Sequence, residues 1–289
     1  MQGSFFRGIK KDTIEDAKVI VTGLAIDENC SNVVGTQHEP KRFRELTEVV
    51  TPFAMDGTFI GDVSIYDNGD VTSFKDIEEV ARKVFKEKGF PFFIGGDHSV
   101  SINTEKVFIE KVVSKGKTPV IIHMDAHADI MEIYQGNVYS HATPNYHAIQ
   151  NGLKPENLTM IGIRSYEDVE VEYLKNNPEI KVYGIERIWE LGISKMLEEI
   201  VSKYDKDDVE VYLSLDIDCV DPSYAPGTGT PEAFGLTSKE LLEIVSTLFR
   251  KLNVTAMDIV EISPTADCND ITSYIGVKLF YEILKFLKD

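Results

Sequence analysis

Cysteine is scarce and long hydrophobic runs are absent, and each lack excludes a class of protein. Only three cysteines occur among 289 residues, Cys30, Cys219 and Cys268, and they lie far apart. Such scattered thiols are too few for a disulfide framework or a cysteine-rich zinc site. No apolar stretch approaches the roughly 20 residues needed to cross a bilayer, and the first residues lack a signal-like apolar core. We therefore expect a cytoplasmic protein without a membrane partner.

Positive charge is also in short supply, because 30 Lys and Arg face 48 Asp and Glu and leave a net charge of −18. This balance argues against nucleic acid as a partner and suits a small cationic substrate. Solubility alone explains most acidic surfaces, so the charge carries little weight by itself. No linker-like stretch or repeat interrupts the chain, and we expect residues 1–289 to form a single domain.

Apolar runs that alternate with polar or helical segments predict the fold class. The expected strands are residues 19–26, 92–94, 120–123, 160–163, 182–185, 211–215 and 254–260. Thr237 and Glu240 form a capping-box pattern before an amphipathic helix, and a last helix is expected over residues 271–287 with Ile275, Leu279, Ile283 and Leu287 buried. This alternation predicts a largely parallel α/β sheet covered on both faces. Residues 29–70 are extended and polar, as in a segment rich in loops, and we assign no helix or strand to them.

The most informative motif follows the apolar run 118–122. It contains Asp125, His127 and Asp129, three potential metal ligands spaced two residues apart. Alternate side chains of an extended strand share a face, so a strand continuing here would direct two carboxylates and an imidazole to one point. His123, two residues before Asp125, is expected to pack within the sheet.

Two further apolar runs end in similar groups. Asp216 and Asp218 follow residues 211–215, and His98 follows a glycine pair after residues 92–94. Parallel sheets bind ligands beyond the carboxyl ends of their strands, where all these side chains fall. Each Asp could instead cap a turn and each His could be a core group, but burying so many anions without a cation is costly.

Together, four carboxylates and two imidazoles exceed what one zinc ion normally takes. Oxygen-rich sites suit Mn²⁺ or Mg²⁺, and imidazoles favour Mn²⁺. Two ions sharing bridging carboxylates would use all six groups. The predicted metal ligands are His98, Asp125, His127, Asp129, Asp216 and Asp218.

Four segments carry a resemblance to a known family. They are Gly95-Gly96-Asp97-His98-Ser99, Asp125-Ala126-His127-Ala128-Asp129, Ser214-Leu215-Asp216-Ile217-Asp218 and Glu261-Ile262-Ser263-Pro264. In order and separation they resemble the signature segments of the ureohydrolases, the family of arginases and agmatinases. The resemblance implies a three-layer α/β/α fold with a central eight-stranded sheet, two Mn²⁺ ions per subunit, and a homo-oligomer of three or six chains.

The resemblance also implies roles for residues outside the ligand set. Glu261 would pair with a substrate guanidinium, and Thr230 would line the guanidinium pocket. Asp129 would accept a proton from the attacking water and pass it to the leaving nitrogen, while His141 would exchange protons with solvent. Water shared by two cations supplies the nucleophile, since its pKa falls from about 15.7 toward about 7. In the simpler alternative, Glu261 only hydrogen-bonds a ligand, and His141 and Thr230 belong to loops and turns.

Two departures from the arginase pattern narrow the substrate. Met131 stands where arginases usually have an asparagine that helps to hold a carboxylate, and Ser165-Tyr166-Glu167 replaces an Asp-rich segment. Agmatine has no carboxylate and leaves no anion unpaired beside Met131. We therefore expect hydrolysis of agmatine to putrescine and urea.

Several alternatives stay open. Within the family they are arginase, guanidinobutyrase, guanidinopropionase and formimidoylglutamase activities. Outside it they are a single-zinc deacetylase, whose fold resembles this one, and a non-catalytic protein stabilised by metal. The number of ions bound per chain and the release of urea separate these classes.

Overall fold

The computed structural model describes residues 5–288, which build an eight-stranded parallel sheet flanked by helices. The strand order is β2-β1-β3-β8-β7-β4-β5-β6, and each pair of neighbouring strands is parallel. The strands are β1 Val19–Leu24, β2 Ile65–Val71, β3 Phe90–Ile94, β4 Thr118–Met124, β5 Leu158–Ile161, β6 Lys181–Tyr183, β7 Val209–Asp216 and β8 Val254–Val260. The α/β class and the eight-stranded sheet are confirmed. That the chain is one domain stays a prediction.

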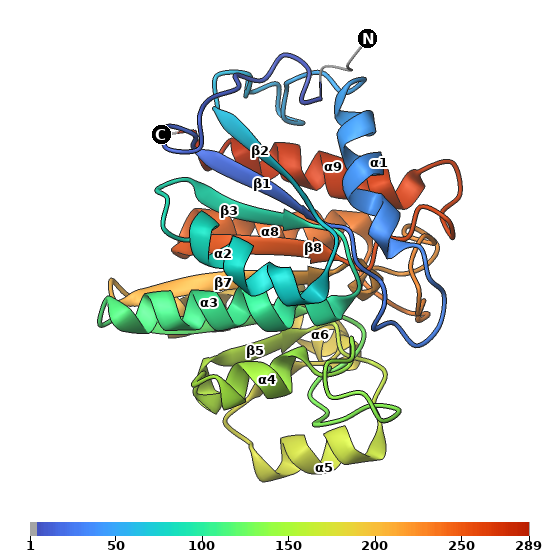
Figure 1. Cartoon of the computed structure of the whole chain (residues 1–289). Helices are drawn as coiled ribbons and strands as arrows, with labels where there is room; N and C mark the ends of the chain where they lie inside the picture. The colour runs from blue at the N-terminus through green and yellow to red at the C-terminus, as the bar shows by residue number, and fades with distance from the viewer. Residues whose placement is uncertain (1–4, 289) are drawn as a thin grey trace.

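Helices cover both faces of the sheet and complete three layers (Figure 1). The α-helices are α1 Glu39–Thr47, α2 Ile77–Val84, α3 Ser101–Ser114, α4 Pro144–Gln150, α5 Asp168–Asn176, α6 Ile185–Leu191, α7 Ile193–Tyr204, α8 Ser238–Lys251 and α9 Ile271–Leu284. Short 3₁₀ helices span Thr36–His38, Phe74–Asp76, His98–Val100, Pro155–Asn157 and Ile217–Cys219. In Figure 1, α2, α3 and α4 lie on one face, and α1, α8 and α9 on the other. Alternate residues of β1 supply the two cores, with Val19 and Val21 in one and Ile20 in the other.

All seven strands expected from apolar runs are present, with each end within two residues of its expected position. The eighth, β2, was missed because its sequence, Ile-Tyr-Asp-Asn-Gly-Asp-Val, is mostly polar. This strand lies at the edge of the sheet, with β1 on one side and an isolated bridge from Lys11 to Ile65 on the other, so its middle residues remain partly exposed. The unassigned segment 29–70 contains α1 and most of β2 rather than loop alone.

The helix predictions are confirmed in outline. The Thr237 hydroxyl accepts from the Glu240 backbone N–H at 3.1 Å, and the Glu240 carboxylate accepts from the Thr237 N–H at 2.8 Å, which completes the capping box of α8. The last helix ends at Leu284 instead of residue 287, and Ile275 and Leu287 are only partly buried, whereas Leu279 and Ile283 are buried as expected. No helix of residues 5–288 has both the length and the apolar character needed to span a bilayer.

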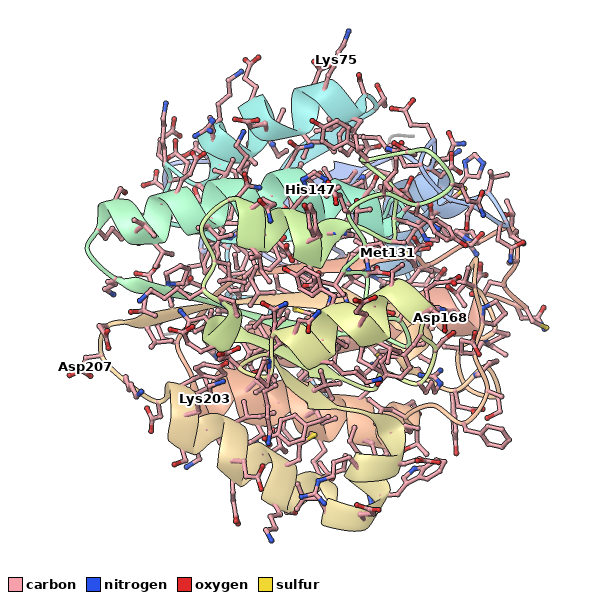
Figure 2. All side chains as sticks on the ribbon, turned by 90° about the horizontal axis from the view of Figure 1, so that it is seen from below. Lys75, Met131, His147, Asp168, Lys203 and Asp207 are labelled. Carbon is pink, nitrogen blue, oxygen red and sulfur yellow. The ribbon has the colours of Figure 1, made fainter. Side chains whose placement is uncertain are left out.

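Figure 2 shows which end of the sheet carries the chemistry. Asp207, just before β7 begins, lies at one end of the molecule, where the strands start. Met131, beyond the end of β4, and Asp168, at the start of α5, lie toward the opposite end. The loops that leave the carboxyl ends of the strands therefore gather the candidate site.

Candidate metal centre

His98 is the centre of the first group of candidate ligands. Its Nδ1 lies 3.0 Å from Asp125 Oδ2, 3.1 Å from Asp129 Oδ2 and 3.3 Å from Asp216 Oδ2. His98 and Asp125 are fully buried, and the other two carboxylates are at most 5% exposed. The carboxyl ends of three strands, β3, β4 and β7, thus bring these residues to one point.

His127 is the centre of a second group. Its Nδ1 lies 3.3 Å from Asp125 Oδ1 and 3.1 Å from Asp218 Oδ2. Asp125 therefore faces His98 with one oxygen and His127 with the other. The six predicted ligands form two adjoining groups that share a carboxylate, an arrangement suited to a pair of ions.

The expected geometry behind the first motif is wrong. β4 ends at Met124, so Asp125, His127 and Asp129 lie on a loop and do not share a strand face. Asp125 Oδ1 accepts from the His127 N–H at 2.6 Å, and Asp129 adopts a left-handed φ of 48°. A turn stabilised by the Asp side chain, rather than strand alternation, thus brings these groups together.

The same correction applies to the second motif. Asp216 is the last residue of β7, and Asp218 already belongs to a 3₁₀ turn. Asp216 Oδ1 accepts from the Asp218 N–H at 2.8 Å and so bends the chain. Asp218 Oδ1 in turn accepts from the Ala126 N–H at 3.0 Å, which ties the two motif loops to each other.

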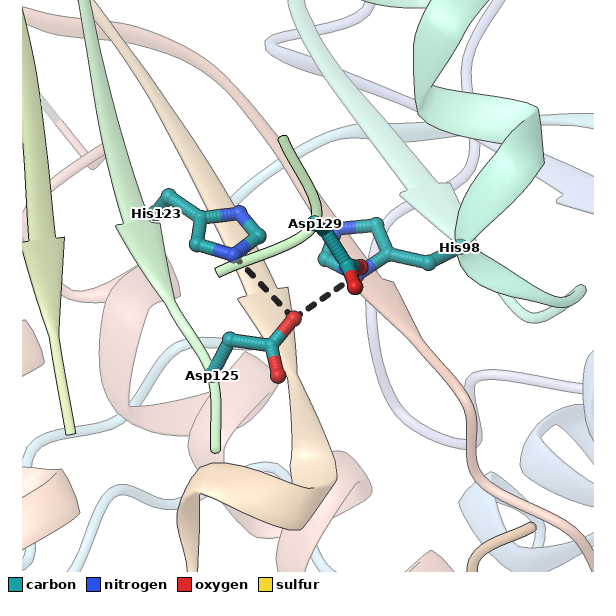
Figure 3. Close-up of side chains that lie close together, drawn as sticks. All are labelled: His98, His123, Asp125 and Asp129. Carbon is teal, nitrogen blue, oxygen red and sulfur yellow. Dashed lines mark ion pairs between the residues drawn. The ribbon is translucent and has the colours of Figure 1, made fainter. Parts of the chain in front are cut away.

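His123 is part of the centre although it was expected only to pack in the sheet. It is fully buried in β4, and its Nε2 lies 3.1 Å from Asp125 Oδ2 (Figure 3). Its ring stacks on that of His98 with centroids 5.0 Å apart. The sequence held part of this signal, because His123 stands only two residues before Asp125 and therefore lies next to the motif loop.

The donor set fits divalent cations. Burial, together with Asp218 and Asp125, raises the pKa of Asp216 well above its ordinary value. Burial and the nearby Asp97 do the same for the pKa of Glu261. His98 Nδ1 and Asp125 Oδ2 are buried and form no directed hydrogen bond, although they lie 3.0 Å apart. These two atoms are directed at a shared point and not at each other, and several buried acids surround them. A cation at that point would stabilise this arrangement.

The three residues with predicted roles in substrate handling lie beside these groups. Glu261 follows β8 with a left-handed φ of 62°, and its Oε1 accepts from the His98 N–H at 2.8 Å. His141 Nδ1 lies 3.8 Å from Glu261 Oε1, and its Nε2 lies 2.8 Å from Ser31 Oγ. The Thr230 hydroxyl donates to Asp218 Oδ2 at 3.2 Å. All three therefore contact the centre or one another.

A cavity of about 450 Å³ opens onto the centre. Its walls are formed by Ser31, Asn32, His127, Asp129, Met131, Tyr134, His141, Ala142, Ser165, Tyr166, Glu167, Glu170, Thr230, Pro231 and Glu232. Three glutamates line it, and no lysine or arginine does so within the described part of the chain. Burial raises the pKa of Glu170 to about 7. Glu167 lies in the Ser165-Tyr166-Glu167 segment noted in the sequence, whereas Glu170 and Glu232 come from segments without a recognisable pattern and were not identified.

Comparisons with known proteins agree with this geometry. The family model described as "Arginase family" matches residues 17–285. The chain is 34% identical to an agmatinase of Bacillus cereus over 284 residues, covering 94% of this chain and 92% of that protein. It is also 30% identical to a guanidinopropionase of Pseudomonas aeruginosa, covering 94% and 87%.

A solved structure extends the similarity to the whole fold. The agmatine ureohydrolase of Thermoplasma volcanium matches with a TM-score of 0.86 at 28% identity, covering 100% of this chain and 96% of that chain. With the family model spanning residues 17–285, the chain belongs to the arginase family and is a metal-dependent amidinohydrolase, as its four motifs predicted.

Proposed function

We propose that this protein hydrolyses agmatine to putrescine and urea. The observation that supports this substrate is the charge of the cavity, which is lined by Glu167, Glu170 and Glu232 without a lysine or arginine among its described lining residues. Arginine, guanidinobutyrate, guanidinopropionate and formimidoylglutamate all carry a carboxylate, which would enter this acidic cavity without a cationic partner. Agmatine carries an ammonium group at that end, and the glutamates complement it.

We propose two Mn²⁺ ions per chain as the cofactor. His98, Asp125, Asp129 and Asp216 would hold one ion, and His127 and Asp218 would hold the other with help from shared carboxylates. Carboxylate oxygens with one imidazole at each ion suit Mn²⁺ better than zinc. When bound, such a pair supplies a water that ionises near neutral pH.

The protein's own groups would orient the substrate and move protons. Glu261 pairs with the guanidinium, and the His98 N–H holds one of its oxygens in place at 2.8 Å. Asp129 accepts a proton from the attacking water and returns it to the leaving nitrogen. His141, on the cavity wall and 3.8 Å from Glu261, exchanges protons between this region and solvent. Thr230 forms the wall beside Asp218.

A homo-oligomer of three or six chains and a cytoplasmic location complete the proposal. Trp189 and Phe234, 59% and 72% exposed, adjoin a second hollow and give the chain an apolar surface that a second copy could cover. All three cysteines are free, as is usual in a reducing compartment.

Kinetics on purified protein loaded with Mn²⁺ test the substrate. Agmatine, arginine, 4-guanidinobutyrate, 3-guanidinopropionate and formimidoylglutamate would be compared by product release. We expect kcat/KM for agmatine to exceed every other value by about 100-fold or more, since an unpaired carboxylate is costly in an acidic site. A preference for any carboxylate-bearing substrate contradicts the proposal.

Metal analysis on the same samples separates the other classes. Two ions per chain are expected, whereas a single-zinc deacetylase would bind one. Full metal loading without hydrolysis of any of these compounds would favour a non-catalytic protein.

A further inference from the structure

A basic hollow lies where the strands of the sheet begin, at the opposite end of the strands from the candidate metal centre. Its volume is about 500 Å³, and its charged lining residues are Lys18, Lys88, Lys111, Lys115, Lys117 and Glu210. Five lysines to one acidic residue reverse the balance of the whole chain, in which 48 acidic residues face 30 basic ones. Positive charge is therefore concentrated at one place in an acidic protein.

Five neighbouring strands bring these lining residues together. β1, β3, β8, β7 and β4 are adjacent in this order, and the hollow is lined by residues at or just before the start of each. The Phe90 N–H donates to the Lys18 carbonyl oxygen at 2.7 Å. A Cβ atom on Gly89 would lie 2.6 Å from the Ala17 carbonyl oxygen, so glycine is needed for this close approach of β1 and β3. The approach places Lys18 and Lys88 in the same hollow.

A buried carboxylate fixes the positions of two of the lysines. Glu210 is only 4% exposed, and its two oxygens accept from Lys115 Nζ at 3.1 Å and 3.0 Å. Lys117 Nζ lies 3.0 Å from Glu210 Oε1. The Lys115 and Lys117 side chains still remain 42% and 35% exposed. Glu210 therefore holds two ammonium groups in place at the surface of the hollow while its charge balances only one of them.

Other positive charges in the hollow lack such a partner. Lys88 and Lys111 form no ion pair within residues 5–288. Lys111 Nζ lies over the Phe85 ring, 5.4 Å from its centroid. Burial and the nearby Lys115 lower the pKa of Lys111, which is the effect of crowding positive charges in a partly buried place. An anion in the hollow would relieve this repulsion.

Stabilisation of a helix end explains only part of the cluster. Lys111 lies in the last turn of α3 and Lys115 directly follows this helix, where cations interact favourably with the helix dipole. Lys18, Lys88 and Lys117 come instead from the segments that precede β1, β3 and β4. The helix dipole therefore does not account for their convergence on the same hollow.

We propose that the basic hollow binds an anion made of several linked phosphate groups, supplied either by a nucleoside triphosphate or by free inorganic polyphosphate. Five lysines and one glutamate leave an excess of four positive charges. A single phosphate group carries only about 1.5 to 2 negative charges near neutral pH, so several linked groups match the hollow better. Lysine is a common ligand of phosphate, and a hollow lined by one sign of charge concentrates ions of the opposite sign.

Titration calorimetry on the full-length protein tests this site. The protein is loaded with Mn²⁺ and dialysed free of unbound metal, because free Mn²⁺ would itself bind polyphosphate. Inorganic triphosphate, ATP and inorganic phosphate are compared. We expect one triphosphate per chain, binding at least about 10-fold more tightly than inorganic phosphate, since more charges interact at short range. Binding should weaken as salt is added, because the lysines are partly exposed and their charges are screened.

Three lysine variants separate this site from general attraction of anions. Lys88→Ala and Lys111→Ala each remove one charge from the hollow, and neither leaves Glu210 without a partner. We expect each to raise the dissociation constant of triphosphate about 5-fold to 10-fold. Lys75, an exposed lysine just after the carboxyl end of β2, is the matched control. Lys75→Ala removes the same charge elsewhere and should bind triphosphate as the wild type does.

The ATP measurement identifies the source of the phosphate chain. ATP binding at least as tight as that of triphosphate supports a nucleotide, and clearly weaker ATP binding supports free polyphosphate. Absence of triphosphate binding to the wild type overturns the inference. Equal binding by wild type, Lys88→Ala and Lys111→Ala also overturns it, because the anion would then be held elsewhere or be drawing Mn²⁺ from the metal centre. None of these outcomes depends on which guanidino compound is hydrolysed, so the proposed function and this site stand or fall separately.

Discussion

His123 Nε2 lies 3.1 Å from Asp125 Oδ2, so an imidazole outside the family motifs contacts the carboxylate that both ligand groups share. The same nitrogen lies 3.2 Å from the His127 carbonyl oxygen. His123 therefore touches the loop that carries half of the candidate ligands. Its place in β4, directly before that loop, makes it a support for the position of Asp125.

Replacing His123 by alanine should weaken this support. We expect Mn²⁺ affinity and kcat/KM to fall about 10-fold to 100-fold, the range typical of partners behind a metal ligand. His123→Gln keeps an N–H donor and should recover part of the loss. Metal titration and steady-state kinetics measure both effects, and wild-type values for His123→Ala would show that Asp125 needs no such partner.

Glu170 should favour substrates with a distal ammonium group. Glu170→Gln removes a charge from the cavity wall but keeps a side chain suited to the capping box at the start of α5. We expect KM for agmatine to rise about 5-fold to 10-fold with little change in kcat, in line with a partly buried ion pair. Butylguanidine, which lacks the ammonium group, is the control and should keep its KM. An equal rise for both compounds would contradict a contact with the distal amine.

The same residue should make agmatine binding depend on pH. Burial raises the pKa of Glu170 to about 7, so its negative charge grows as pH rises through that value. Cations held at Asp129 would lower this pKa, which places the change at or below about 7. We expect the KM ratio of agmatine to butylguanidine to fall from pH 5.5 to pH 8, and Glu170→Gln to flatten this profile.

Glu105, on α3, should reduce stability at neutral pH. It is fully buried, neither carboxyl oxygen has a hydrogen-bond partner within residues 5–288, and burial with the nearby Asp258 raises its pKa well above 4.5. The folded chain keeps Glu105 neutral while the unfolded chain ionises it. Glu105 therefore lowers the free energy of unfolding only above pH 4.5. The loss grows by about 1.4 kcal/mol per pH unit until the pH reaches the pKa of Glu105 in the folded state.

Glu105→Gln cannot ionise and should escape this penalty. We expect the free energy of unfolding of this variant to exceed that of the wild type at pH 7, with the difference shrinking toward pH 4.5. Urea denaturation at several pH values measures it. A difference that does not change with pH would mean that Glu105 does not titrate between the two states.

Metal removal should destabilise the fold, and more so at higher pH. Burial raises the folded-state pKa values of Asp216 and Glu261. In metal-free protein their contribution to stability is full below their ordinary pKa values and is lost as pH rises and both groups are forced to ionise. Cations relieve this cost and bind only the folded state. The rise in Tm between EDTA-treated and Mn²⁺-loaded samples should therefore be larger at pH 8 than at pH 5.5, and equal shifts at both values would contradict this coupling.

Apolar patterning predicted most of the fold for a physical reason. Strands buried on both faces, such as β7, are runs of apolar residues that stand out from their polar surroundings. β2 lacks that signal, since edge strands are only half covered. β2 takes its place beside β1 because of contacts with the rest of the sheet. A local sequence pattern carries no information about those contacts.

The parts of the candidate site that lie close together in the sequence could be predicted. The parts that only folding brings together could not. His98, Asp125 and Asp216 were identified because each ends an apolar run. The left-handed φ values of Asp129 and Glu261 were not, because single non-glycine residues in this conformation depend on tertiary contacts. Glu170 and Glu232 come from distant segments and line the same cavity, so their joint effect on the charge of the cavity could not be predicted without the structure.

The position of β8 has a consequence for biosynthesis. This strand, residues 254–260, separates β3 from β7, and so stands between the segment that delivers His98 and the one that delivers Asp216. A nascent chain cannot join the two halves of its sheet until this late strand has left the ribosome and inserted between them. Shorter chains would expose unpaired strand edges and lack some of the candidate metal ligands' supports, which makes metal capture a late event in the maturation of each molecule.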